Sequence, residues 1–439
     1  MRVRFQAGII AIVLACVLSQ AGSTGTFKVG YAERDITPSK PTPMWGYGAR
    51  HDRLSEGVID PLYAKGVVID TSAEKIALVG LDLGRGPTEG GMKLIREAVK
   101  GRSGVGYLLI SGSHTHHGPV IELKNEPGKG QGKFDDAVEY AERLNLILID
   151  LINEAASKVQ DARIGWGTAE VEMNRNRHTK IRPKVTDPEM AVVRFDDLSG
   201  KPIAMFVNFA AHPVILKAED LRFSADYPGR MMNAVQEAMG APCFFLQGAG
   251  GDMSPQKRNE SDGIEEFGKD LAEEVIKIVK EIETAPPENP SIKAKDRSYE
   301  FDTRPDLMNP FAQRMLSSAF FPELVKAFTD ELADNKIRPC MTTVLLNGEL
   351  ALVGASGEFF CNHSNRLKER SRAKATVFIG YCNGHHMYFP TIEAAAEGGY
   401  GADPTVSWVP LGSGEKMMND ALIDIYSFLG RFADEALRR

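Results

Sequence analysis

Apolar positions along the chain alternate with polar ones in a pattern that predicts several β-strands. Two β-branched, apolar runs around a polar turn predict a hairpin over residues 65–83. A second hairpin is predicted over 344–354, where Asn347 and Gly348 provide the turn. The short apolar run at 105–112 predicts a further strand.

Other segments repeat their apolar residues every three or four positions, which predicts amphipathic helices. Residues 136–158 and 263–283 show this spacing. A C-terminal helix is predicted from the apolar positions Met418, Leu422, Ile425, Leu429 and Phe432. Strands that alternate with helices, with hairpins among them, indicate an α/β fold in which mixed β-sheets form the centre and helices flank them.

The predicted elements extend over most of the chain without a repeat of fixed period. We therefore expect one large domain over residues 26–439. The only linker-like stretch, the proline-rich segment at 284–291, would open an insertion at about 285–340.

The N-terminus is expected to be a targeting segment rather than part of the fold. Arg2 and Arg4 precede an apolar stretch over 7–18, and small residues follow it, which is typical of a secretory signal peptide over residues 1–21. A lipoprotein signal, in which Cys16 would carry the lipid, stays open as the alternative. Either signal implies an exported protein, and the second implies a lipid-anchored contact with a membrane surface.

The composition and charge of the chain argue against some classes of binding partner. The chain has 439 residues, 43% of them hydrophobic and 25% charged, as an ordinary globular protein has. Its net charge is −7 and it contains no long basic run, which argues against binding to nucleic acid. The N-terminal apolar stretch is too short to span a bilayer comfortably, so no transmembrane span is expected.

Four cysteines follow the N-terminal segment: Cys243, Cys340, Cys361 and Cys382. An oxidising compartment would permit disulfides among them in three pairings. Buried free thiols are the alternative, and the sequence does not decide between the two.

Polar residues that could carry chemistry gather where apolar strands end. The chain has nine histidines, and His114, His116 and His117 follow directly on the apolar run "GYLLI". Other predicted strands end in His212, in Asp252 and Ser254, in Glu358, and in His385, His386 and Tyr388. The loops at the carboxyl ends of strands are where α/β sheets build their sites.

Imidazole and carboxylate groups in this arrangement favour a catalytic metal such as Zn²⁺. A His-x-His pair on extended backbone presents both side chains on one face, so one could bind a metal while the other reaches a substrate. Each element also has an ordinary explanation. The His-x-His turn could be solvated, His212 could be a half-buried core histidine, and Glu358 could be a surface carboxylate. The chain has no G-x-S-x-G elbow, and its "GAGGD" turn lacks the lysine of a P-loop.

A set of motifs in this order resembles the catalytic domain of the neutral/alkaline non-lysosomal ceramidases and their shorter bacterial relatives. The motifs span nearly the whole chain after the N-terminal segment. They are "VGYAERDITP" (29–38), "MWGYGAR" (44–50), "GLDLG" (80–84), "LLISGSHTHHGP" (108–119), "MNRN" (173–176), "NFAAHP" (208–213), "SADYPG" (224–229), "GAGGDMSP" (248–255), "GEFF" (357–360) and "IGYCNGHHMYFPTIEAAAEGGYGA" (379–402).

The resemblance implies a zinc-dependent enzyme that hydrolyses an amide. In that family two histidines, a glutamate and a tyrosine bind the zinc. The matching residues here are His114 of the HTH motif, His212 before the proline, Glu358 and Tyr388.

The same resemblance implies catalytic roles for further residues. His116 would transfer a proton, Tyr400 and Arg175 would stabilise the oxyanion or orient the substrate, and Ser254 would orient groups or attack the carbonyl itself. Arg177 is the alternative to Arg175, because it follows two positions later. From its place in the turn, Asp252 is expected to support a metal ligand or Ser254. Whether zinc-activated water or Ser254 is the nucleophile stays open.

The chain departs from the family pattern in three places. His117 stands where the family usually has serine, Gln256 stands where ceramidases have asparagine, and no run of short strands for a C-terminal immunoglobulin-like domain follows the last predicted helix. The expected function is therefore a secreted, zinc-dependent amidohydrolase that acts on ceramide or a related N-acyl lipid or small molecule. Two alternatives stay open: a metal-dependent esterase or lactonase that uses the same site, and a non-catalytic lipid- or glycan-binding relative.

Overall fold

The larger of two central sheets has eight strands. The computed structural model describes residues 26–433, so the signal expected over residues 1–21, including Cys16, lies outside this part. The strands lie in the order β11-β9-β8-β6-β1-β3-β4-β5. Their bounds are β1 (Lys28–Asp35), β3 (Tyr63–Asp70), β4 (Lys75–Leu81), β5 (Tyr107–Gly112), β6 (Gln160–Glu170), β8 (Glu189–Asp197), β9 (Pro202–Phe209) and β11 (Cys243–Gln247). β4 and β5 pair in parallel, as do β9 and β11, whereas the remaining neighbours are antiparallel, so the sheet is mixed.

The smaller sheet has four strands in the order β13-β16-β17-β19. They are β13 (Ile292–Ser298), β16 (Cys340–Leu346), β17 (Leu350–Ala355) and β19 (Ala375–Ile379). The two hairpins predicted from the sequence are confirmed as β3–β4 and β16–β17, both antiparallel. Asn347 and Gly348 turn the second hairpin with positive φ angles of 54° and 70°, a backbone conformation that asparagine and glycine tolerate.

Helices flank both sheets, and short strand pairs connect the loops. The helices are α1 (Glu89–Ser103), α2 (Asp135–Ser157), α3 (Asp226–Met239), α4 (Ile264–Glu281), α5 (Pro310–Ala319), α6 (Pro322–Glu331), α7 (Cys361–Arg370), α8 (Ile392–Glu397) and α9 (Ser413–Phe428), with the 3₁₀ turn η1 (Gly48–Arg50). The short strands are β2 (Gly57–Val58), β7 (Asn174–Asn176), β10 (Arg222–Phe223), β12 (Met253–Pro255), β14 (Phe301–Asp302), β15 (Lys336–Ile337), β18 (Glu358–Phe359) and β20 (Tyr388–Phe389). Within residues 26–433, no helix combines the length and apolar character needed to cross a bilayer.

The helices predicted from periodicity are confirmed as α2, α4 and α9, with one difference at the C-terminus. The spacing predicted helix as far as Phe432, but α9 ends at Phe428. Gly430 follows with a positive φ of 64°, a left-handed conformation that ends helices. Leu429 and Phe432 therefore lie beyond the helix that their spacing predicted.

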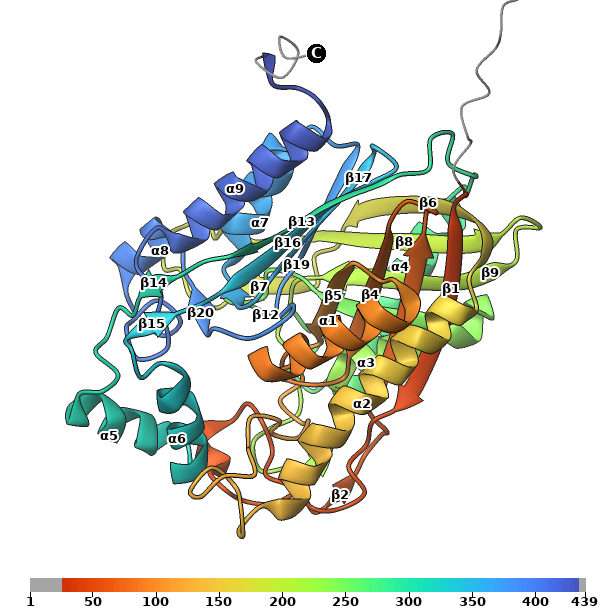
Figure 1. Ribbon diagram of the computed structural model, residues 1–439. Coiled ribbons are helices and arrows are strands. Elements are labelled where there is room, and N and C mark those ends of the chain that lie inside the picture. The colour runs from red at the N-terminus through yellow and green to blue at the C-terminus, as the bar shows by residue number, and fades with distance from the viewer. Residues whose placement is uncertain (1–25, 434–439) are drawn as a thin grey trace, which may run out of the picture.

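Two sheets and two helical layers stack into four layers (Figure 1). Ala77 and Val79 on one face of β4 pack with α1 and α2, because successive strand residues point to opposite faces. Ile76 and Leu78 on the other face share a core with the strands of the smaller sheet. Val353 on the far face of that sheet packs with α9. The mixed α/β architecture predicted from the sequence is therefore the observed one.

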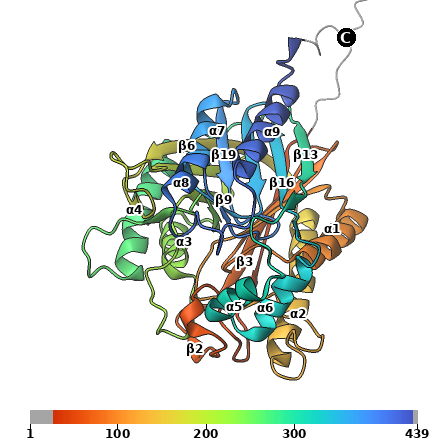
Figure 2. The same cartoon turned by 90° about the vertical axis from the view of Figure 1, so that its left-hand side faces the viewer.

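The region expected to be an insertion at about 285–340 has two parts. Its first part is β13, which pairs with β16 along seven residues and forms the edge of the smaller sheet. Its second part contains α5 and α6, which lie together outside the four layers, on the face turned to the viewer in Figure 2.

Buried polar side chains link the two sheets at the ends of their strands. The amide of Asn208 on β9 donates hydrogen bonds to the carbonyl of Leu246 on β11, at 2.8 Å, and to that of Phe378 on β19, at 3.0 Å. The hydroxyl of Ser111 on β5 donates to the carbonyl of Gly380, just after β19, at 2.8 Å. These contacts bring the carboxyl ends of β5, β9 and β11 next to that of β19.

All four cysteines of the described region are free thiols. The sequence alone had left disulfides among them as an alternative. The thiol of Cys361 donates to a carboxylate oxygen of Asp252 at 3.3 Å, and that of Cys340 donates to the carbonyl of Asn383 at 3.5 Å. Burial raises the pKa of the Cys243 thiol to about 12, so this group stays protonated.

We expect Asn208→Val to lower the free energy of unfolding by about 2–4 kcal/mol, because it leaves two buried carbonyls without donors. Equilibrium urea denaturation measures this change. Asn419→Val is the matched control: Asn419 is exposed on α9, and its change should stay within about 0.5 kcal/mol. Equal effects of the two substitutions would show that the link between the sheets does not stabilise the fold.

Candidate metal centre

His114 lies two residues beyond β5, in a strained conformation that aims its ring inward. Its φ of 68° is in the left-handed region, which is rare for residues other than glycine. The ring is buried, and Nδ1 donates a hydrogen bond to the carbonyl of Gly84 at 2.7 Å. This hydrogen bond fixes the proton on Nδ1 and leaves the lone pair of Nε2 free to bind a cation.

His212 follows β9 and is anchored in the same way. Its Nδ1 donates to the carbonyl of Gly250 at 2.6 Å, and its side chain is fully buried. Burial, followed by the nearby guanidinium of Arg177, lowers the pKa of His212 to about 3. The ring is therefore neutral, and its Nε2 is also free to accept.

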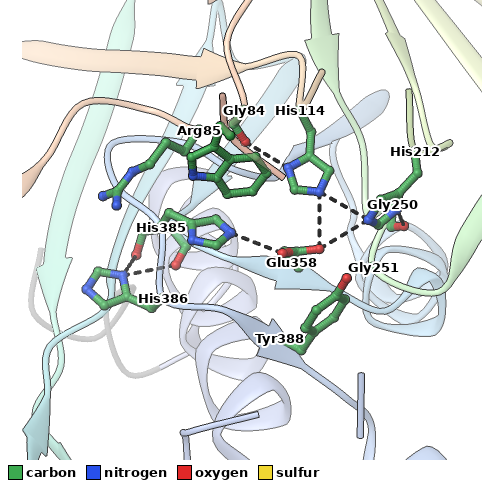
Figure 3. A network of polar contacts seen from close by, with 12 residues as sticks. Gly84, Arg85, His114, His212, Gly250, Gly251, Glu358, His385, His386 and Tyr388 are labelled. Carbon is green, nitrogen blue, oxygen red and sulfur yellow. Dashed lines mark hydrogen bonds and ion pairs between the residues drawn. The ribbon is translucent and has the colours of Figure 1, made fainter. Parts of the chain in front are cut away.

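Glu358 supplies a carboxylate opposite these two rings. It lies on β18, which pairs in parallel with β20, and Tyr388 is its direct neighbour in that pair. Its Oε2 lies 3.3 Å from Nε2 of His114 and 3.2 Å from Nε2 of His212, and these two nitrogens are 3.1 Å apart (Figure 3). Burial alone would raise the pKa of Glu358, but His114, His212 and His385 outweigh it and hold this pKa well below its usual range.

The three ligand atoms fit a tetrahedral divalent cation. Zinc bonds of 2.0–2.1 Å at tetrahedral angles separate ligand atoms by about 3.3–3.4 Å, close to the separations of 3.1–3.3 Å seen here. Oε2 of Glu358 is also buried without a hydrogen bond from the described part of the chain. Such an oxygen, buried beside two imidazole nitrogens, leaves a polar group of the site without a partner among the described residues. The donor set therefore suits a metal ion.

Tyr388 and Arg177 complete this side of the cluster. The Tyr388 side chain is buried, and Figure 3 shows it extending toward Glu358 and His212. The guanidinium of Arg177 donates to the Tyr388 hydroxyl at 3.1 Å and to the carbonyl of Gly251 at 3.0 Å, and it lies 2.9 Å from Nε2 of His212.

The structure places Arg177 at the cluster, and not Arg175, the residue expected from the sequence. Arg175 is exposed in the middle of β7, whereas its neighbours Asn174 and Asn176 are buried. The strand ends at Asn176, and the chain then turns, with the amide of Arg177 bonded to the carbonyl of Asp252 at 2.8 Å. This turn breaks the alternation of the strand and brings the second arginine inward.

His116 lies beside the cluster with a ring held by aromatic neighbours. Its Nε2 is 3.4 Å from Nε2 of His114, and its Nδ1 is buried without a hydrogen-bond partner in the described region. The rings of Trp45 and Tyr47 contact it edge-on, with centroids at 5.5 and 4.8 Å. A Cβ at Gly46 would lie 2.4 Å from Cγ of His116, so only glycine fits there. Burial, followed by His114 and His212, lowers the pKa of His116 well below its usual value and keeps the ring neutral.

Two residues predicted from the "GAGGD" turn lie apart from the ligand atoms. The carboxylate of Asp252 accepts hydrogen bonds from the amide of Cys361, at 2.7 Å, and from the side chain of Asn176, at 2.6 Å. It thereby ties the turn after β7 to the start of α7, and supports Arg177 and Glu358 through the backbone. The Ser254 hydroxyl makes no hydrogen bond to the cluster within residues 26–433, and its side chain is nearly buried.

Tyr400 is at the rim of the site. Its residue is 65% exposed, and its ring meets that of Tyr388 edge-on with centroids 5.5 Å apart. It can reach a bound molecule from outside, but it does not enclose the ligand atoms.

His117, the departure from the family pattern, points away from the cluster. Its Nε2 accepts a hydrogen bond from the buried guanidinium of Arg50 at 2.6 Å. Arg50 also donates to the carbonyls of Ala218 and Asp220, both at 2.9 Å. Burial, followed by the charge of Arg50, lowers the pKa of His117 to about 4, so it stays a neutral acceptor. The pair fixes the histidine turn against the loop after His212.

A mostly apolar chamber of about 490 Å³ leads outward from the cluster. His116, Glu358 and Tyr388 line its inner end, and η1 contributes Gly48. Its outer wall comes from α5, α6 and their flanking residues, including Phe311, Met315, Leu316, Phe320, Phe321 and Phe328. No sequence signal identified this wall, because α5 and α6 fall in the region whose pattern was least clear.

Two plant proteins that are similar to this chain are neutral ceramidases. The chain is 26% identical over 261 residues to the neutral ceramidase of Oryza sativa subsp. japonica and 24% identical over 224 residues to neutral ceramidase 1 of Arabidopsis thaliana. These alignments cover 53% and 47% of this chain, but only 32% and 28% of the plant proteins, so about a third of each relative is matched. No family model matches the chain.

The fold is similar to that of solved ceramidases over nearly the whole chain. The neutral ceramidase from Pseudomonas aeruginosa superposes with a TM-score of 0.72 at 18% identity, and the match covers 93% of this chain and 75% of that one. A ceramidase complexed with C2 gives a TM-score of 0.71 at 18% identity, with coverages of 93% and 76%. The sequence similarity to neutral ceramidases and the similarity of the fold to solved ceramidases thus agree.

Proposed function

We propose that this chain is a zinc-dependent amidohydrolase that cleaves the N-acyl amide bond of an N-acyl lipid, as a ceramidase does. One observation carries the proposal: two buried histidines and a carboxylate present ligand atoms at tetrahedral spacing at the inner end of an apolar chamber. The similarity to neutral ceramidases supports the choice of an amide as the bond that is cleaved.

His114, His212 and Glu358 would hold the metal, and Tyr388 is the residue placed to join them. When bound, a zinc ion of this type supplies Lewis-acid chemistry, which lowers the pKa of a nearby water and polarises a carbonyl group. The remaining tasks of orientation and proton transfer fall to side chains of the chain itself.

His116 is placed to move the proton in this reaction. Its neutral ring faces the cluster through Nε2, so it can take a proton from an attacking water and deliver it to the leaving amine. Arg177 and Tyr388 lie next to each other beside His212, where a cation and a hydroxyl can stabilise the oxyanion. Water is the nucleophile we propose, because the Ser254 hydroxyl has no histidine among residues 26–433 as a hydrogen-bond partner that could activate it.

The chamber defines the proposed substrate. Its phenylalanine and methionine side chains suit an apolar acyl chain, and its inner end holds the groups that would act on an amide. A solved ceramidase of this fold is complexed with C2, which supports a substrate of the same class here. The plant relatives are matched over only about a third of their length, so ceramide and other N-acyl lipids are both substrates to test.

The sequence of residues 1–21 supports a location outside the cytoplasm. We propose that the chain is exported and meets its substrate there, either as a secreted protein or through lipid attached to Cys16.

Removal of a ligand should remove the metal. We expect the purified protein to contain about one zinc ion per chain, and His114→Ala and Glu358→Gln each to lose it together with N-acyl lipid hydrolysis. Elemental analysis measures zinc, and assays with N-acyl and O-acyl substrates side by side measure activity. Full zinc occupancy in both variants would refute the ligand assignment, and preference for the O-acyl substrate would favour an esterase.

The two neighbouring arginines make a matched pair of variants. Arg177→Ala should lower kcat/KM by about 10²–10³-fold, the cost of losing one oriented donor to developing charge. Arg175→Ala should leave it nearly unchanged, because this side chain is exposed on β7. Steady-state kinetics of both variants on one N-acyl lipid shows which arginine the reaction needs. A larger loss of kcat/KM in Arg175→Ala than in Arg177→Ala would instead support Arg175, the arginine expected from the sequence.

The length of the acyl chain should depend on the wall formed by α5. Ala312 lines the chamber, so Ala312→Trp should raise KM for long-chain N-acyl substrates by about 10-fold or more and spare short-chain ones. Ser317→Trp is the control on the same helix, because Ser317 is exposed and does not line the chamber. An equal effect of Ala312→Trp on short and long substrates would place the acyl chain elsewhere.

A further inference from the structure

Glu358 presents its two carboxylate oxygens to different partners. Oε2 faces His114 and His212, where the proposed metal would bind. Oε1 faces the opposite way and lies 3.1 Å from Nε2 of His385 (Figure 3). The ionised carboxylate can only accept at Oε1, so the Nε2 of His385 must carry the proton and donate it.

The ring of His385 is held in place from several sides. Its side chain is only 3% exposed. Trp45 contacts the ring edge-on at a centroid distance of 5.3 Å, and Tyr381 stacks with it at 6.3 Å. The hydrogen-bond donor is therefore not free to rotate away from Glu358.

The loop that carries His385 is attached to the strand that carries His114. The side chain of Asn383 accepts from the amide of Ile110 at 3.0 Å and donates to the carbonyl of Leu108 at 2.6 Å, both on β5. Asn383 and Met387 on either side of His385 have positive φ angles of 60° and 59°. The backbone thus adopts an unfavourable conformation, fixed by β5, that brings His385 behind Glu358.

A role for His385 in binding a second metal ion is not supported by the arrangement. His385, Glu358 and His114 lie close enough to form a ligand group of their own. However, His114 has already used Nδ1 to donate to Gly84, and its only free nitrogen, Nε2, faces His212 and Oε2. One nitrogen lone pair cannot bind two ions, so the second group lacks an independent third ligand.

We propose that His385 is a positioning residue of the metal centre, which donates a hydrogen bond to Oε1 of Glu358, holds Oε2 toward the metal and does not bind the metal itself. The inference rests on the metal site proposed above and adds His385 to that site as a supporting residue. Polar groups that orient a ligand in this way typically change metal affinity by about 10–100-fold when they are removed.

The test measures zinc affinity of the full chain by competition with a chelating dye, independently of activity. His385→Ala should bind zinc about 10–100-fold more weakly but still at one ion per chain. His385→Gln should bind nearly as tightly as the unsubstituted protein, because its amide can donate from the place of the Nε2 atom. If His385→Ala does not fold, His385→Met, which has no donor, carries the same expectation.

The neighbouring histidine provides the matched control. His386 points its Nδ1 to Ser356, at 2.9 Å from the hydroxyl oxygen, and contacts no proposed ligand. His386→Ala should therefore keep the zinc affinity of the unsubstituted protein.

Three outcomes would overturn the inference. Unchanged zinc affinity in His385→Ala would show that Glu358 needs no such support. Two ions in the unsubstituted protein and one in His385→Ala would make His385 a ligand. An equal loss of zinc affinity in His386→Ala would show that substitutions in this loop disturb the site in general, without a specific role for His385. A protein that binds no zinc at all would instead refute the proposed function, and this inference with it.

Discussion

The hydrogen bonds that join the two sheets are the constraint on which the site depends. His114 and His212 follow strands of the larger sheet, whereas Glu358 and Tyr388 belong to the segments that follow strands of the smaller one. The donors of Asn208 reach carbonyls on both sheets. A shift of one sheet against the other would leave these buried groups unpaired, at a cost of about 1–3 kcal/mol each. The relative position of the four side chains is thereby fixed by the fold itself.

Burial also keeps three imidazole rings near the site neutral. Desolvation lowers the pKa of His116, His117 and His212. Main-chain carbonyls then decide which nitrogen keeps the proton, as Gly84 does for His114 and Gly250 for His212. The Nε2 lone pairs of His114 and His212 therefore point to the same place before an ion binds. Little reorganisation of the protein would oppose the binding of that ion.

Much of this arrangement could be predicted from the sequence, because it follows from local patterns. Apolar runs that stop at histidine or acidic residues located the strand ends, and the order of motifs indicated the fold. The choice between Arg175 and Arg177 could not be predicted, because it depends on where β7 ends. The partner of His117, Arg50, is distant in sequence and has no recognisable spacing to it. The apolar wall from α5 and α6 also left no signal, since its phenylalanines contribute to the packing of several helices.

The chamber wall and the ligand atoms come from separate parts of the chain. α5 and α6 contribute apolar side chains to the wall but none of the residues that face the proposed metal. Selection can therefore alter the two helices, by substitution or by a change in their length, without disturbing the chemistry at the inner end. Divergence among proteins of this fold should accordingly concentrate in this helical pair, with new substrate ranges arising on an unchanged reaction centre.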